Sequence, residues 1–284
     1  VDGVTSKAEY NLWHPSPGVV AKDLLTAKLR ELDEGIRTDD RILTGANGNV
    51  NSTDGKDANR GLRMMQRELD DALRSAYASH PERPAEFFAD HPNERLQANA
   101  VVYGVREHEI WLFGDCLAMV DGQQIPTMKK VDELLGEVRS FVATAFADGA
   151  QRHERRTQHD NHGESDPYAG ITGVTDDPGR RAILPLLRVQ SWYANRPGKY
   201  GYFVFDGFTL PDWPVKTIPV HQGDEVVLAS DGYPYLHRTL AESEAALVDL
   251  HRDDPQLIHR FRSTKGFLPG SDAYDDRTYL RFIA

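Results

Sequence analysis

The chain is short of cysteine, of long apolar runs and of basic charge. Cys116 is its one cysteine, so no disulfide can form within the chain, and we expect a cytoplasmic location. No stretch reaches the apolar length of a membrane span, and no signal peptide is visible, so we expect no membrane association. These absences disfavour disulfide-stabilised secreted proteins and membrane-spanning proteins.

Basic residues are outnumbered, since 33 Lys and Arg stand against 44 Asp and Glu, for a net charge of −11. No basic stripe is visible, so we expect no nucleic-acid partner. A phosphorylated substrate remains compatible with this charge, because bound cations can neutralise local carboxylates. Walker loops and nucleophile-elbow serines are also missing. Val1 has no nucleophilic side chain, which disfavours an N-terminal-nucleophile hydrolase.

No internal repeat or low-complexity linker divides the 284 residues, so we predict one α/β domain over 1–284, made of antiparallel sheets and helices. We expect the first helix to end at Gly35 and a late helix to begin at Asp254-Pro255. Thr239-Leu-Ala-Glu242 is a capping box. Apolar spacing predicts helices over 20–32, 62–76, 131–142, 183–195 and 240–250. Short apolar runs predict strands over 97–105, 109–113, 116–120, 200–205, 213–220, 225–229 and 278–283.

Aspartates stand at the ends of several of these strands. Asp231 follows the run 225–229, Asp115 follows 110–113, and Asp275 precedes the last strand. Asp2 stands in Val1-Asp-Gly at the start of the chain, a pattern typical of a strand end, so we expect an upstream strand to be missing from this sequence. Residues this far apart can meet only in the fold, where carboxylates are the ligands that hard divalent cations prefer.

These aspartates can also be interpreted as parts of structural turns instead of metal ligands, because Asp-Gly turns are common. Asp206-Gly207 has the same form beside another predicted strand, which shows how little one such dipeptide specifies. A second candidate metal site, His153, His159 and His162, lies in the polar stretch 151–166, for which a solvated loop is the ordinary interpretation.

Taken in order, four stretches resemble the metal-dependent type 2C (PPM-type) protein phosphatases, as a divergent, bacterial-type member. Val1-Asp-Gly3 resembles the first Asp-Gly element of that family. Trp111-Leu-Phe-Gly-Asp-Cys116 is similar to its strand ending in Gly-Asp-Ser, and Val227-Leu-Ala-Ser-Asp-Gly232 is similar to its Leu-Ala-Ser-Asp-Gly element. Tyr274-Asp-Asp-Arg-Thr278 resembles its terminal Asp-Asn-x-Thr, with Asp276 in place of Asn.

The resemblance implies a β-sandwich of two antiparallel sheets flanked by helix pairs. It implies two Mn²⁺ or Mg²⁺ ions, a third, weaker metal position, and a metal-bridging hydroxide that attacks a phosphoserine, a phosphothreonine or a small phosphomonoester. The implied metal ligands are Asp2, the Gly3 carbonyl, Asp231 and Asp275, with Asp115 near the third ion. Lys7 and Arg277 are candidates for contacting phosphate, and the competing interpretation is a solvated charge.

The sequence departs from the family pattern in two places. Val4 stands where the family has the His that protonates the leaving group, so no catalytic side chain is assigned. The stretch 122–213 has no close counterpart in the family pattern. These departures leave two alternatives open: a catalytically impaired, phosphatase-like regulatory or interaction domain, and a different hydrolase on a similar sandwich, such as an amidohydrolase. Oligomeric state is not indicated.

Overall fold

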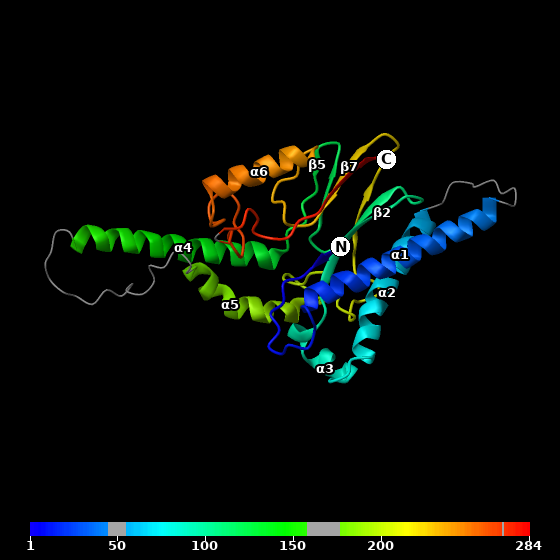
Figure 1. Cartoon of the computed structure of the whole chain (residues 1–284), viewed down its shortest axis with the longest axis horizontal. Coiled ribbons are helices and arrows are strands. Elements are labelled where there is room, and N and C mark those ends of the chain that lie inside the picture. Colours follow the sequence, from blue (N-terminus) through cyan, green and yellow to red (C-terminus); the bar gives the residue numbers. More distant parts are fainter. Residues whose placement is uncertain (45–54, 158–176, 269) are drawn as a thin grey trace. The chain divides into compact units, whose positions relative to one another are not determined.

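The computed structural model describes residues 1–44, 55–157, 177–268 and 270–284, and it describes side chains outside 36–58, 150–176 and 269. The chain forms two units (Figure 1). The first unit comprises Val1–Thr127, Ser191–Asp231 and Arg277–Ala284, and the second comprises Met128–Gln190 and Gly232–Asp276. The assignment of one domain to 1–284 stays a prediction. The three histidine side chains of 151–166 lie outside the described residues.

The strands of the first unit form two antiparallel sheets, which confirms the predicted α/β class. The strands of the first sheet follow the order β1 (Asp2–Gly3), β2 (Ala98–Gly104), β3 (Glu109–Phe113) and β6 (Lys216–Pro219). Those of the second follow the order β5 (Gln123–Gln124), β4 (Leu117–Val120), β7 (Glu225–Ala229) and β8 (Tyr279–Ile283). Every pairing between neighbours is antiparallel.

The two sheets face each other across a shared apolar core. Ile110 and Leu112 of β3 pack in one cluster with Val226 and Leu228 of β7. The rings of Tyr103 on β2 and Phe282 on β8 approach to 4.9 Å between centroids. Because side chains alternate between faces along a strand, these contacts identify the inner face of a β-sandwich.

Two long helices cover the outer face of the first sheet. They are α1 (Pro17–Thr44) and α2 (Gly55–Ala78), which lie side by side in Figure 1. Leu25, Leu69 and Leu73 are fully buried there, in one cluster with Trp111 and Phe113 of β3. This strand is therefore buried on both faces, which explains its unbroken apolar run.

Shorter elements complete the first unit: α3 (Ala85–Asp90) and the 3₁₀ turns η1 (Pro92–Glu94) and η2 (Ser191–Tyr193). The strand predicted over 200–205 is wrong. Phe205 makes a single bridge to Ala98, with N–O distances of 3.0 and 3.1 Å, and Tyr202 makes another to Ala194. Two isolated bridges satisfy this segment without a continuous ladder.

The second unit contains α4 (Lys130–Thr157), α5 (Pro178–Gln190) and α6 (Leu240–Asp253). The capping box is confirmed: Thr239 Oγ1 accepts from the Glu242 amide at 3.2 Å, and Glu242 Oε2 accepts from the Thr239 amide at 3.1 Å. The helix predicted over 183–195 instead begins at Pro178 and contains Pro185 in its interior. None of the described helices combines the length and hydropathy that a membrane span needs.

The helix predicted to begin at Asp254 is wrong, because Asp254 is the C-cap of α6. Its carboxylate accepts from the amides of Ile258, His259 and Arg260 at 2.7–3.0 Å, and from that of Phe261 at 3.4 Å. These bonds fold the following residues into a turn around the carboxylate. Burial raises the pKa of Asp254, but the four amide donors outweigh burial and hold the pKa below its usual range.

Replacing Asp254 with Asn is expected to lower the free energy of unfolding of the second unit by about 1–3 kcal/mol at pH 7. A pKa that is lower in the folded state stabilises fully above the unfolded pKa of about 3.9, and this stabilisation is lost as pH falls through the folded pKa. The deficit of the variant should therefore shrink below about pH 3.9. The free energy of unfolding of both proteins is measured by urea unfolding between about pH 2 and pH 7, with hydrogen exchange of the α6 amides as the readout. The exposed Asp249→Asn variant serves as the control, and a deficit independent of pH would contradict the assignment.

Candidate functional site

The first unit brings three of the predicted aspartates to one end of its sandwich. In the ladder between β4 and β7, Leu117 lies opposite Ala229, so Asp115-Cys116 and Ser230-Asp231 leave the sheet at the same end. Asp2 lies on β1, opposite Asn99 of β2. Neighbouring strand ends thus place residues that are more than a hundred positions apart in the sequence in one region.

Cys116 reports the electrostatics of this region. Its side chain is 2% exposed. Burial raises the pKa of the Cys116 thiol well above its usual range, the carboxylates of Asp2, Asp115 and Asp231 raise it further, and the amino group of Val1 opposes them. The three carboxylates therefore all lie near enough to the thiol to act on it electrostatically. A thiol held neutral in this way is a poor nucleophile, so chemistry at this site falls to the carboxylates.

Asn99 is a member of this site that the sequence did not indicate. Its Nδ2 donates to Asp115 Oδ1, which fixes the orientation of the amide, and its Oδ1 is buried without a hydrogen-bond partner in the described part of the chain. Gly114, at φ +96°, wraps around this oxygen: a Cβ there would lie 2.0 Å from Asn99 Oδ1. The result is an orphaned oxygen beside acidic side chains.

The predicted residues near the start of the chain have structural contacts of their own. Gly3 packs directly against Gly18 at the beginning of α1, and a Cβ on Gly3 would lie 2.2 Å from the Gly18 carbonyl oxygen. The Val4 amide donates to Gln97 O at 2.9 Å. Lys7 Nζ donates to Thr5 O at 2.8 Å. β1 is thus held between α1 and β2, which positions Asp2.

Asp275 belongs to the second unit, where Lys265 Nζ lies 2.6 Å from its Oδ2. Burial raises the pKa of Asp275 and the Lys265 ammonium opposes that rise. The amide of Asp276 donates to Asp275 Oδ1 at 3.2 Å. Arg277, half-buried, begins the last segment of the first unit.

The donor set in the first unit suits a hard cation in chemistry, since it consists of carboxylate oxygens and an orphaned amide oxygen. Among the described residues, no three His, Cys, Asp or Glu side chains are arranged to hold one ion together. Mg²⁺ usually takes only one or two carboxylates and keeps several waters, so such a cage is not required. The roles of Asp2, Asp115, Asp231 and Asp275 as ligands stay predictions.

The dipeptide Asp206-Gly207 has a structural role. Asp206 is fully buried, pairs with Arg95 at 3.0 Å and accepts from Asn195 Nδ2 at 2.8 Å. Burial raises its pKa, and the Arg95 guanidinium opposes that rise. Gly207, at φ +78°, then turns the chain toward α2.

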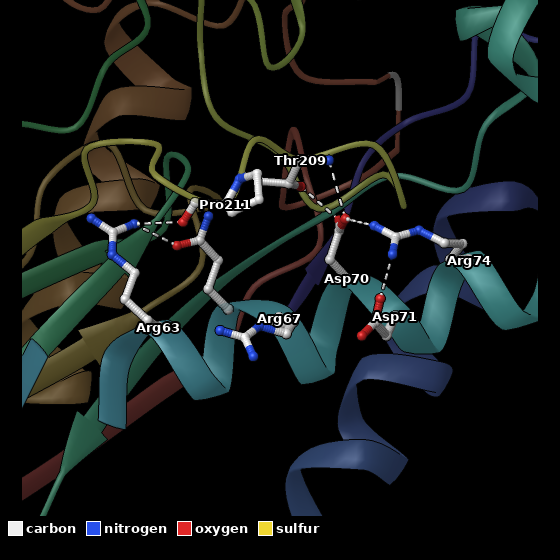
Figure 2. A pocket seen from close by; sticks show the side chains of 8 residues that line it. Arg63, Arg67, Asp70, Asp71, Arg74, Thr209 and Pro211 are labelled. Carbon is white, nitrogen blue, oxygen red and sulfur yellow. Dashed lines mark hydrogen bonds and ion pairs between the residues drawn. The ribbon is translucent and has the colours of Figure 1, made fainter. Parts of the chain in front are cut away.

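A separate pocket of about 180 Å³ lies between α2 and the segment 207–213 (Figure 2). Arg63, Arg67 and Arg74 line it from α2, and Thr209 and Pro211 line it from the segment. No short-range motif marked this pocket in the sequence, because its polar residues are spread along a helix whose other face builds the core.

Comparison with known proteins leaves the family open: no family model and no curated protein matches the chain. Among solved structures, it is similar to a crystal structure of the catalytic domain of the serine/threonine protein phosphatase PstP in complex with two manganese ions. The likeness covers 88% of this chain and 81% of that chain, at 12% sequence identity and a TM-score of 0.29. A TM-score this low does not establish a shared fold, so the likeness carries no functional assignment.

Proposed function

We propose that the chain is a metal-dependent phosphomonoester hydrolase whose substrates are Ser/Thr phosphoproteins. The observation that carries this proposal is the gathering of Asp2, Asp115 and Asp231 around Cys116 in the first unit. Acidic side chains brought to one end of a sandwich from distant strands repel one another, and a bound cation would offset that repulsion. The order of the four sequence motifs agrees with this chemistry.

In this proposal Asp2, Asp231 and Asp115 bind the cations, and Asn99 orients Asp115 while offering its own Oδ1. Asp275 and the Gly3 carbonyl stay candidate ligands on the strength of their motifs alone, and Lys7 and Arg277 remain candidates for contacting phosphate. Bound Mn²⁺ or Mg²⁺ would supply charge neutralisation and water activation at the phosphorus.

Val4 gives the site a specific chemical property, since an apolar side chain stands where a proton donor is expected. A positioned general acid typically contributes about 10²–10⁴-fold to a rate. Its absence matters little for a phenolate leaving group, whose conjugate acid has a pKa near that of Tyr, about 10. Aryl phosphates are therefore the appropriate first substrates, and phosphoserine peptides should be hydrolysed more slowly.

Replacing Asp231 with Asn is expected to lower Mn²⁺-dependent hydrolysis of an aryl phosphate by at least about 100-fold, because the amide keeps the shape but removes the charge that holds the cation. Turnover and Mn²⁺ binding, the latter by electron paramagnetic resonance, are measured on the same preparations. Asp90→Asn, a matched change of charge on exposed α3, should leave both unchanged.

The same measurements separate the alternatives. Mn²⁺ binding without turnover, lost in Asp231→Asn, would favour the catalytically impaired regulatory domain; the 2.6 Å ion pair between Lys265 and Asp275 is the observation that favours it. Failure of the unsubstituted protein to bind Mn²⁺ at all would overturn the metal-centre proposal, and the Asp-Gly dipeptides would then be structural turns.

A further inference from the structure

The pocket beside α2 has walls that are fixed by a continuous set of hydrogen bonds. Gln66 Nε2 donates to Leu210 O at 3.0 Å, and Arg74 Nε donates to Gly207 O at 3.1 Å. Asp70, 3% exposed, accepts from the Gly207 amide at 2.9 Å and from the Thr209 hydroxyl at 2.6 Å. The segment 207–213 is thus clamped to one helix face, and the pocket is preformed.

Positive charge at one end of this pocket is not neutralised. Arg63 Nη1 donates to Gln66 Oε1, Pro211 O and Trp213 O at 2.7–3.2 Å, and all three acceptors are uncharged. Arg67, exposed and one turn further along α2, makes no hydrogen bond or ion pair within the described part of the chain. Figure 2 shows its guanidinium on the Arg63 side of the pocket.

The opposite end of the pocket is balanced within itself. Arg74 Nη1 lies 2.6 Å from Asp71 Oδ1, and its Nη2 lies 3.4 Å from Asp70 Oδ2. Those two carboxylates are therefore occupied by Arg74 and by the amides of the clamped segment. Arg63 and Arg67 are like charges at i and i+4 on α2, a mildly destabilising arrangement that a bound anion would relieve.

We propose that this pocket binds a phosphate group through Arg63 and Arg67. Arg67 offers its whole guanidinium fork, and Arg63 offers the nitrogens other than Nη1, which donates to Gln66, Pro211 and Trp213. A phosphomonoester carries a charge of about −1.5 to −2 at pH 7, which two guanidinium groups balance better than they balance the single charge of a carboxylate. The volume of about 180 Å³ is below the roughly 300 Å³ at which sites for drug-sized ligands begin. The size therefore favours a single phosphate group over a nucleotide.

The test uses the full chain in EDTA, so that no cation bridges phosphate to the acidic site and failure here is distinct from failure of the proposed hydrolase. Inorganic phosphate and O-phosphoserine are titrated at constant ionic strength, and the amide resonance of Thr209 is followed by NMR. We expect saturable binding in the millimolar range, Arg67→Gln to weaken it at least about 5-fold, and Arg67→Lys to weaken it less, because Lys keeps the charge but loses the fork.

Arg30→Gln on α1, which removes the same charge from another exposed site, is the matched control and should leave the affinity unchanged. Tighter binding of O-phosphoserine than of inorganic phosphate would assign the pocket to a phosphorylated side chain, and the reverse order would assign it to the free ion. Equal affinities of Arg67→Gln and the unsubstituted protein would overturn the proposal, as would equal losses in Arg67→Gln and Arg30→Gln. Unchanged thermal stability of both variants shows that neither result comes from unfolding.

Discussion

Replacing Arg139 with methionine is expected to lower the free energy of unfolding of the second unit by about 3–5 kcal/mol. The guanidinium is 1% exposed, and it lies 2.7 Å from Asp177 Oδ2. It also donates to the carbonyl oxygens of Gln256, Leu257 and Ser263 at 2.7, 3.2 and 2.9 Å. Methionine fills much of the volume but donates no hydrogen bond. Leu257 O keeps the Ser263 amide at 3.0 Å, and Asp177 keeps the Arg180 amide at 2.7 Å. The main loss therefore falls on the carbonyls of Gln256 and Ser263, at about 1–3 kcal/mol for each acceptor left without a donor.

Hydrogen exchange resolves this effect by unit. Amides of α4 and of 254–263 should exchange faster in Arg139→Met, while those of β2 and β3 keep their protection. Arg252→Met is the matched control, because Arg252 forms its ion pairs on the surface, where such pairs contribute about 0–1 kcal/mol. A loss below about 1 kcal/mol in Arg139→Met would show that the buried guanidinium does not organise this unit.

Replacing Gly3 with alanine is expected to lower the free energy of unfolding of the first unit by about 3 kcal/mol, the upper end of the usual cost of overpacking. The added Cβ would lie 2.2 Å from the Gly18 carbonyl oxygen and 2.6 Å from its carbon, and both are backbone atoms that yield only if α1 moves. The approach is also close from the other side, since a Cβ on Gly18 would lie 2.5 Å from Val4 O.

Tryptophan fluorescence during urea unfolding measures this effect, because all four tryptophans belong to the first unit. Gly35→Ala is the matched control: beyond its chain neighbours and the backbone of its own helix, nothing lies within 4 Å of the added Cβ, so the substitution should stabilise by about 0.5–1 kcal/mol through helix propensity. If Gly3→Ala and Gly35→Ala change the free energy of unfolding equally, the close approach of β1 and α1 does not contribute to stability as proposed.

Local sequence predicted the elements whose residues all favour one structure. The run 225–229 is apolar and β-branched, and it forms β7 with the predicted bounds. Thr239 and Glu242 form their capping box because both bonds lie within four residues. Gly35 shows the converse: α1 continues through it to Thr44, since a glycine inside a helix costs only about 1 kcal/mol, which is too little to end a helix by itself.

The helix start predicted at Asp254 was wrong for a different reason. An Asp-Pro dipeptide is compatible with a helix start and with a helix end, and the choice depends on which amides reach the carboxylate. Here the amides of 258–261 do so, and the chain forms a turn. Similarly, the sequence around Phe205 predicts a strand, but Phe205 forms only an isolated β-bridge, to Ala98. Such competition between partners is not encoded in a short window.

By itself, the sequence determined the bounds of β3 and β7, the aspartates that follow them and the mixed α/β class, because these follow from periodicity and turn chemistry over a few residues. Only the tertiary structure decided that Asp2, Asp115 and Asp231 share one region around Cys116, that Asn99 presents an orphaned oxygen there, and that Arg67 flanks a pocket. These features depend on ladder register and on which helix face meets which segment. Both are set by long-range packing, so residues that act together carry no local signal of it.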